Sequence, residues 1–296
     1  MAFVPTLAQM ELQDGGMSYA AQISNGKFIL IDGGQSFEND GERLYNYLSA
    51  KKDTGKIIIA AWIFTHGHFD HIALATEFIK KYRSEIIIEN ILFDVPLEEP
   101  NFYSYPGEEN HLAFEKEFIK TINSLENTNL LEAKAGAEFD FSGVTVQVLS
   151  THNERYPNPP VHRNNASAVY RLIFQNGVSF MVTGDAQGER IKELMNPDSP
   201  AFCTDDRLKS DILQVAHHGL RVSDECDYET VLAFYKKISP KVVFWPIGKD
   251  RFLNDGWIRD KKYIYNDYLL IKAREKNFHH SVTAELNLNT LDVKIL

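Results

Sequence analysis

Hydrophobic positions along this 296-residue chain recur with two different periods, which predict alternating strands and helices. Runs of β-branched and aromatic residues bounded by turn residues are typical of strands, and apolar residues three and four apart are typical of helices. The predicted strands cover residues 17–24, 26–34, 55–65, 85–95, 138–150, 166–175, 178–185, 211–219, 241–248, 282–288 and 291–296. The predicted helices cover residues 40–52, about 70–82, 111–126, 186–195, 227–238 and 265–276.

The order of these elements predicts an α/β protein, because each half of the chain is a run of strands with helices attached. Two mixed sheets that face each other, with helices outside, would bury all the apolar faces. No repeat, low-complexity tract or linker divides the chain, so residues 1–296 are predicted to form a single domain. Residues 96–110 are polar and contain three prolines, which predicts a long loop.

The amino-acid composition of the chain limits the kinds of partner that it can bind. The formal net charge is −10, and an acidic chain is a poor general nucleic-acid binder because phosphate binding needs a basic face. The two cysteines form no disulfide framework, and no apolar run approaches the roughly 20 residues of a membrane span. The N-terminal residues show no signal-peptide pattern. We therefore expect a soluble, cytoplasmic protein with a small-molecule substrate, without a membrane partner and with nucleic acid disfavoured.

One short stretch concentrates metal-ligand side chains. The sequence THGHFDH follows an apolar strand and places His66, His68, Asp70 and His71 within six residues, although the whole chain has only ten histidines. Side chains two apart on an extended chain point the same way, and Gly67 lets the backbone bend between the first two histidines. Imidazoles and carboxylates are the usual ligands of zinc and also suit iron or manganese. The stretch therefore predicts a metal site rather than a solvated polar turn.

Four segments together resemble the metallo-β-lactamase superfamily. THGHFDH is similar to the His-x-His-x-Asp-His signature, while LIDGG at 30–34 and VTGDA at 182–186 resemble two further strand-end motifs. LQVAHHGL at 213–220 and NNASAVYRLIF at 164–174 look most like one branch of the superfamily. That branch includes the β-lactamase-like domain of the competence protein ComEC and the phosphorylcholine esterases. The resemblance implies an αββα four-layer sandwich with a metal site at one edge between the sheets.

The resemblance also implies a set of ligands for two divalent metal ions. His66 and His68 would bind the first ion, and Asp70 and His71 the second. Asp185 would bridge both ions, and Asp32 would support the histidine loop. The last histidine ligand is either His217 or His218, since an extended strand end would point the two side chains in opposite directions. His162 would complete the first site, unless an asparagine, Asn164 or Asn165, replaces it.

This ligand set predicts a dinuclear metallohydrolase that uses a metal-bridged hydroxide, with zinc favoured and manganese or iron as alternatives. Asp70 would orient the hydroxide, and the branch likeness implies a phosphoester or phosphodiester substrate. The predicted catalytic residues are Asp70 and His218, and the predicted substrate-binding residues are Arg163, Asn165, Tyr103 and Tyr105. The alternatives are an iron-dependent redox enzyme of the same fold, a lactone or thioester hydrolase, and a non-catalytic binding module.

Overall fold

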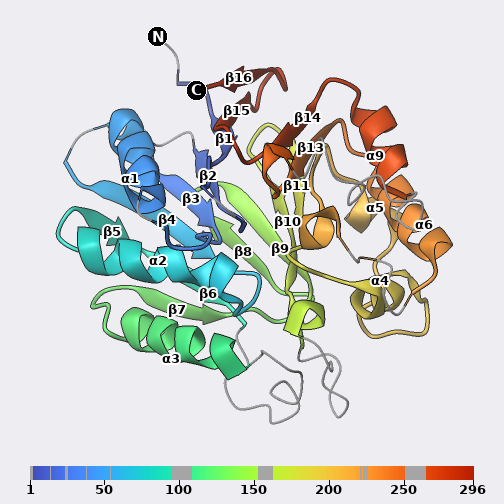
Figure 1. Cartoon of the computed structure of the whole chain (residues 1–296), viewed down its shortest axis with the longest axis horizontal. Helices are drawn as coiled ribbons and strands as arrows, with labels where there is room; N and C mark the ends of the chain where they lie inside the picture. Colours follow the sequence, from blue (N-terminus) through green and yellow to red (C-terminus); the bar gives the residue numbers. More distant parts are fainter. Residues whose placement is uncertain are drawn as a thin grey trace. The chain divides into compact units, whose positions relative to one another are not determined.

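The chain divides into two compact units, each built on one mixed β-sheet (Figure 1). The first unit contains residues 1–132 and 280–296, and the second contains residues 133–279. The computed structural model describes residues 3–13, 15–23, 26–37, 39–53, 55–94, 109–152, 163–220, 222, 226–250 and 265–296. The prediction of two mixed sheets with attached helices is confirmed, and the prediction of a single domain stays a prediction.

The first sheet has nine strands in the order β16-β15-β1-β2-β3-β4-β6-β7, with β5 also paired to β4. Its strands are β1 (Thr6–Gln9), β2 (Tyr19–Gln22), β3 (Phe28–Ile31), β4 (Ile57–Ile63), β5 (Ile86–Ile88), β6 (Asn90–Phe93), β7 (Asn129–Glu132), β15 (Ala284–Asn287) and β16 (Val293–Ile295). The pairings β3–β4, β4–β6 and β6–β7 are parallel, so these strands end at the same sheet edge.

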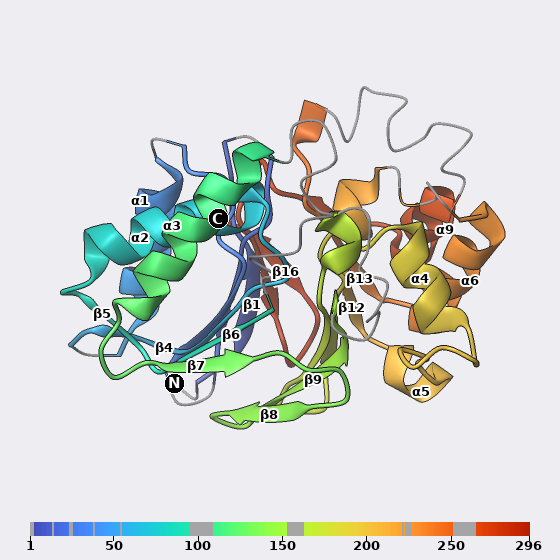
Figure 2. The same ribbon diagram turned by 90° about the horizontal axis from the view of Figure 1, so that it is seen from below.

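Three helices cover one face of the first sheet: α1 (Asp40–Lys51), α2 (Phe69–Tyr82) and α3 (Glu109–Asn123) (Figure 2). Their apolar faces join the strands in one core that contains Trp62, Phe64 and Phe78. Helix α3 buries Phe118 and Ile122 as its spacing predicts, but Phe114 is 44% exposed. The predicted strand 85–95 is two strands, because the chain breaks the ladder at Glu89, whose N–H donates to the carbonyl of Ile59.

The second sheet has seven strands in the order β14-β13-β12-β11-β10-β9-β8. Its strands are β8 (Glu138–Phe141), β9 (Val144–Ser150), β10 (Val169–Ile173), β11 (Ser179–Val182), β12 (Ile212–Gln214), β13 (Val242–Trp245) and β14 (Asn277–His279). Strands β11 to β14 are parallel neighbours. Among the described residues, the helices of this unit are η3 (Arg163–Ala166), α4 (Gly188–Met195), α5 (Asp205–Leu208), η4 (Ala216–Gly219), α6 (Tyr228–Ile238) and α9 (Tyr265–Ala273). Their core lies around Phe234, Tyr235 and Trp245.

Asp211 ties the amino ends of three parallel strands together. Its carboxylate accepts hydrogen bonds from the backbone N–H and hydroxyl of Ser179, at 3.0 and 3.2 Å, and forms an ion pair with Lys241 at 2.7 Å. Burial alone would raise the pKa of Asp211, but the hydrogen bonds from Lys241 and Ser179 outweigh it and lower the pKa. The hydrogen bonds and the ion pair of Asp211 therefore join the amino ends of the strands β11, β12 and β13.

Three expectations about local structure were incomplete. Strands β1, β7 and β14 and helix α5 were not predicted, since each has at most four residues and too few positions to show a period. The predicted strands 17–24 and 26–34 are shorter in the structure, where β2 and β3 pair antiparallel, and residues 24 and 25 lie outside the described residues. The predicted strand 211–219 ends at Gln214, and the chain then turns sharply through η4.

Candidate metal centre

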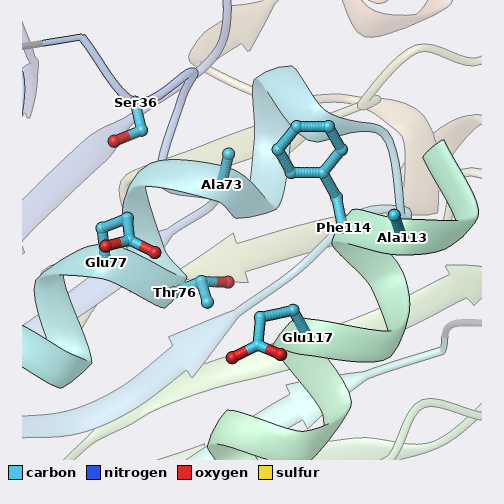
Figure 3. A pocket seen from close by; sticks show the side chains of 7 residues that line it. All are labelled: Ser36, Ala73, Thr76, Glu77, Ala113, Phe114 and Glu117. Atoms are coloured by element: carbon cyan, nitrogen blue, oxygen red, sulfur yellow. The ribbon is translucent and has the colours of Figure 1, made fainter. Parts of the chain in front are cut away.

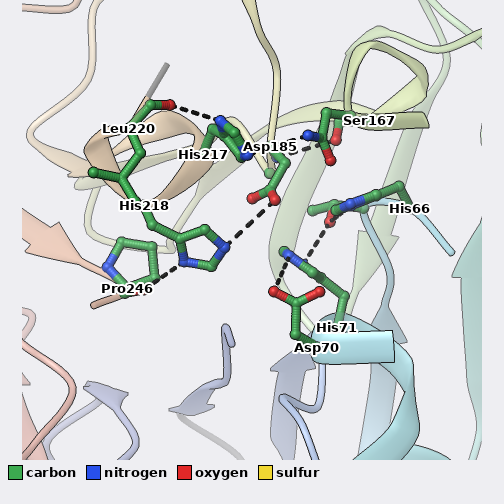
Figure 4. Close-up of polar contacts among 12 residues, drawn as sticks. His66, Asp70, His71, Ser167, Asp185, His217, His218, Leu220 and Pro246 are labelled. Carbon is green, nitrogen blue, oxygen red and sulfur yellow. Dashed lines mark hydrogen bonds and ion pairs between the residues drawn. The ribbon is translucent and has the colours of Figure 1, made fainter. Parts of the chain in front are cut away.

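The first group of donors lies where β4 passes into α2. We call residues 64–68 the donor loop, which carries His66 and His68. Asp70 and His71 lie in the first turn of α2 (Figure 4). The three histidines are almost fully buried, and the ring centroids lie 4.7 Å apart for His66 and His68 and 4.1 Å apart for His66 and His71. Three imidazoles packed this closely form a cluster of the ligand type that zinc, iron and manganese bind in proteins.

The donors of this group fall into two pairs. One ring nitrogen of His66 lies within 4.8 Å of one ring nitrogen of His68. Nε2 of His71 lies 3.9 Å from Oδ2 of Asp70, whose side chain is 20% exposed. Each pair offers the nitrogen and oxygen atoms that a zinc, iron or manganese ion takes as ligands.

Asp32 holds the donor loop from the end of β3, as the resemblance implied. Its carboxylate accepts hydrogen bonds from the backbone N–H of Thr65 at 2.8 Å, the hydroxyl of Thr65 at 2.7 Å and Nδ1 of His71 at 2.6 Å. Burial raises the pKa of Asp32, and the hydrogen bonds from His71 and Thr65 oppose that rise. Because Nδ1–H of His71 donates to this carboxylate, Nε2 is the nitrogen with a lone pair for a metal.

Two residues of α3 that sequence reasoning missed also contact the donor loop. The ring centroid of His111 lies 4.2 Å from that of His68, and Glu115, one turn further on, is 1% exposed and packs against Gly67. A Cβ on Gly67 would lie only 2.8 Å from Cγ and from Cδ of Glu115. In the sequence, His111 and Glu115 lie on the same helix face as Phe118 and Ile122, which faces the core. Polar side chains are rare on such a face unless they make a specific contact, so this pattern could have indicated their role.

A pocket of about 240 Å³ lies between α2 and α3 (Figure 3). It is lined by Ser36, Ala73, Thr76, Glu77, Ala113, Phe114 and Glu117. Lys80 bridges the two glutamates at 3.1 and 3.0 Å, and Lys120 lies 3.6 Å from Glu117. The charges at its rim therefore balance, and nothing in the lining selects a charged ligand.

The second group of donors follows two parallel strands of the other unit. Asp185 comes after β11 and is 2% exposed, and its backbone N–H donates to the hydroxyl of Ser167 at 3.0 Å. The turn before it is fixed by Gln214, whose Oε1 accepts the backbone N–H groups of Thr183 and Gly184 at 2.7 and 2.8 Å. Carboxyl ends of parallel strands are the usual place for ligands in open α/β sheets, and this turn aims a carboxylate from that edge.

His217 and His218 are not in an extended strand end, which corrects the premise that their side chains simply alternate. Both residues are left-handed, with φ of 45° and 56°, and Gly219 follows at 81°. Such residues cost on the order of 1–3 kcal/mol each, so the surrounding contacts must impose them. Trp245 packs directly over Gly219 and leaves no room for a Cβ there.

The two histidines of this turn make different contacts. Nδ1–H of His218 donates to the carbonyl of Pro246, and its Nε2 lies 3.4 Å from Oδ2 of Asp185 (Figure 4). Nδ1–H of His217 donates to the carbonyl of Leu220 at 2.6 Å, and its Nε2 accepts the amide of Asn164 at 3.1 Å. The Nε2 lone pair of His218 thus points towards the Asp185 carboxylate. Both ring nitrogens of His217 instead make hydrogen bonds that hold the turn.

Of the remaining predicted site residues, Arg163 and Asn165 lie within the described part of the chain. Asn165 is fully buried, and its side-chain oxygen accepts the backbone N–H groups of Gln187 and Arg190, at 3.1 and 3.4 Å. Arg163 is 2% exposed. Their roles in substrate binding stay predictions, while His162, Tyr103 and Tyr105 lie outside the described residues.

Comparison with known proteins identifies the family. Residues 13–232, about three quarters of the chain, match the family described as the metallo-beta-lactamase superfamily. The chain therefore belongs to the metallo-β-lactamase superfamily, whose members are mostly metal-dependent hydrolases. The predicted fold class, the α/β sandwich of this family with two mixed sheets and flanking helices, is confirmed.

Solved structures resemble this chain at low sequence identity. CmlA, a diiron β-hydroxylase from Streptomyces venezuelae, has a TM-score of 0.51 at 12% identity over 97% of this chain and 55% of its own. The metallo hydrolase Igni18 from Ignicoccus hospitalis has a TM-score of 0.49 at 15% identity over 95% of this chain and 98% of its own. YhfI from Bacillus subtilis has a TM-score of 0.46 at 12% identity over 81% of this chain and 85% of its own.

The likeness to CmlA bears on the fold alone, and this chain spans about half the length of CmlA. Comparison with curated proteins by sequence finds no significant match. Within the described residues, no helix combines the length and the apolar character that crossing a bilayer requires.

Proposed function

We propose that this protein is a metal-dependent hydrolase that binds two divalent ions. The proposed ligands are His66, His68, Asp70, His71, Asp185 and His218. One observation carries the proposal: in His71 and in His218, Nδ1–H donates to an oxygen acceptor, Asp32 and the Pro246 carbonyl respectively. This is how metal-binding histidines are usually oriented, because it fixes Nε2 as the ligand atom.

The chemistry of the donors fits such ions. Asp185 and His218 offer a carboxylate oxygen and an imidazole nitrogen 3.4 Å apart, which are both ligand types of a zinc ion. The first unit offers three imidazoles and a carboxylate in two pairs, which fits two ions better than one. Asp185 is proposed to bridge the ions, and His162 or Asn164 to complete the ligands of the first.

When bound, two such ions would lower the pKa of water at the site and stabilise negative charge on a phosphoryl or carbonyl oxygen. Asp70 would accept a hydrogen bond from the attacking water and orient it, since its partly exposed carboxylate can reach solvent. Asp32 would hold His71 in the tautomer that binds through Nε2. His217 would keep the η4 turn in its left-handed form through Leu220 and Asn164.

A phosphoester or phosphodiester is the proposed substrate class. Support comes from the likeness of two segments, the His-His-Gly turn and the Asn-Asn stretch, to the ComEC and phosphorylcholine esterase branch. The structure places these segments in contact, since Asn164 donates to His217. Zinc is the proposed metal, and a cytoplasmic location stays a prediction.

Metal analysis and a substrate panel test the proposal together. Protein purified without chelator should contain about two equivalents of zinc, manganese or iron by elemental analysis. It should hydrolyse bis(p-nitrophenyl) phosphate or p-nitrophenyl phosphate faster than a chromogenic lactone or thioester. Near-zero metal with no gain in melting temperature on adding metal would refute the metal centre. Iron with oxygen consumption, and no ester hydrolysis, would establish the redox alternative instead.

A further inference from the structure

The amino end of α2 lacks the usual helix cap. The first N–H groups of a helix have no partner within the helix, and a side chain at the N-cap position usually accepts one of them. Here His68 occupies the N-cap position with an extended backbone, and its side chain makes no capping hydrogen bond. A ring that accepted a helix N–H would have one nitrogen less for a metal, so capping and ligation compete at this residue.

A histidine from another helix accepts the first of these N–H groups. The backbone N–H of Phe69 donates to Nδ1 of His111 at 3.4 Å. The His111 ring also packs against the ring of His68, with centroids 4.2 Å apart and a 34° tilt, and against Phe69 at 5.1 Å. Because Nδ1 accepts, the neutral His111 carries its proton on Nε2.

Helix α3 meets the donor loop at a second point. Glu115 follows His111 by four residues, so both side chains lie on one face of α3. Its carboxyl group fills the space that a side chain on Gly67 would need. Gly67 and Phe69 flank His68, so α3 fixes the backbone on both sides of this donor.

We propose that His111, by accepting the N–H of Phe69 and packing against the ring of His68, caps the first N–H of α2 and holds the His68 imidazole in the orientation in which it binds a metal ion. His111 is then a positioning residue, which acts on the centre through the backbone of Phe69 and the ring of His68. The metal-binding part of this inference rests on the proposed function, whereas the capping part does not.

Four variants separate the two contacts of His111. In His111→Asn, the amide oxygen takes the place of Nδ1 and keeps an acceptor, but the ring is lost. In His111→Phe the ring is kept and the acceptor is lost, and His111→Ala removes both. Lys116→Ala changes an exposed residue of the same helix and is the matched control.

The first measurement uses the metal-free protein, with amide hydrogen exchange of Phe69 followed by NMR. Exchange should be about tenfold faster in His111→Ala and His111→Phe than in the wild type, the scale expected for a lost cap. His111→Asn and Lys116→Ala should remain near the wild-type rate. Equal exchange in all five proteins would overturn the capping role.

The second measurement is zinc affinity, determined by competition with a chelator. His111→Ala should weaken one of two bound ions by about 10–100-fold, the usual effect of disturbing a residue that orients a ligand, with the other ion unchanged. Unchanged zinc affinity in a variant with faster exchange would overturn the positioning role. A wild-type protein that binds no zinc would instead refute the proposed function, and the exchange experiment would still decide the cap.

Discussion

The contact between Gly67 and Glu115 gives the sharpest quantitative test of how the donor loop is built. Replacing Gly67 with alanine adds one methyl group where Glu115 already lies. The backbone of Gly67 is not among the positive-φ positions, so alanine can adopt its conformation without strain. Any destabilisation must therefore come from the collision and not from the backbone.

The magnitude follows from the distances. The new methyl carbon would lie 2.1 Å from Oε1 and 2.8 Å from both Cγ and Cδ of Glu115, well inside the 3.4–4 Å of ordinary contact. Glu115 is 1% exposed, so its side chain cannot move into solvent without opening the packing around it. Overpacking of this kind costs about 1–3 kcal/mol. In a Glu115→Ala background the space is empty, and Gly67→Ala should then cost close to nothing.

A double-mutant cycle in urea measures the coupling. The cycle compares the free energies of unfolding of the wild type, the two single variants and the double variant. The interaction energy should be about 1–3 kcal/mol, and the double variant should be more stable than the sum of the two single effects predicts. Gly41→Ala is the matched control, because nothing lies within 4 Å of its Cβ position in α1 and alanine favours a helix. Equal costs for Gly67→Ala in both backgrounds would refute the packing described here.

Three further predictions address the proposed chemistry and the stability of the second unit. Asp70→Ala should lower kcat/KM on the best substrate by at least about 10²-fold. Asp198→Ala, at an exposed position, should leave kcat/KM unchanged. Full activity of Asp70→Ala would place the reaction elsewhere. His218→Ala should lose bound metal by elemental analysis, while His217→Ala should keep its metal and lose about 10–100-fold in turnover; the reverse result would exchange their roles. Asp211→Asn should unfold at a lower urea midpoint than the wild type at pH 7. Because the folded state lowers the pKa of Asp211, this difference in midpoint should shrink as the pH falls below about 4. A difference that stays constant with pH would contradict the anchoring role of Asp211.

The donors were predictable from sequence because their signal is local. His66, His68, Asp70 and His71 stand within six residues of each other, and strand periodicity alone places them after β4. The same holds for Asp185 after β11, where a strand and a turn glycine precede the carboxylate. The fold class was equally predictable from sequence, because it depends on long segments in which apolar residues recur with a period of two or 3.6.

The choice between His217 and His218 was not predictable, because it depends on backbone conformation and on distant partners. Two consecutive left-handed histidines contradict the extended geometry that a strand end suggests. The acceptor for His218 is Pro246, 28 residues away and directly after β13, and the donor to His217 is Asn164, 53 residues away. Only the parallel pairing of β12 with β13 brings the first of these groups together.

The same reasoning explains why α3 went unrecognised as part of the centre. From sequence, His111 and Glu115 look like polar members of an ordinary amphipathic helix. Their meaning depends on which neighbour their face meets: glutamate is rarely buried without a specific contact, and here the contact is the one residue of the donor loop that has no side chain. Gly67 is therefore glycine because Glu115 occupies the space beside it, and not because its backbone conformation requires glycine. A motif in one segment and a glutamate 48 residues later form one packing unit, so changes at either position should be tolerated only together.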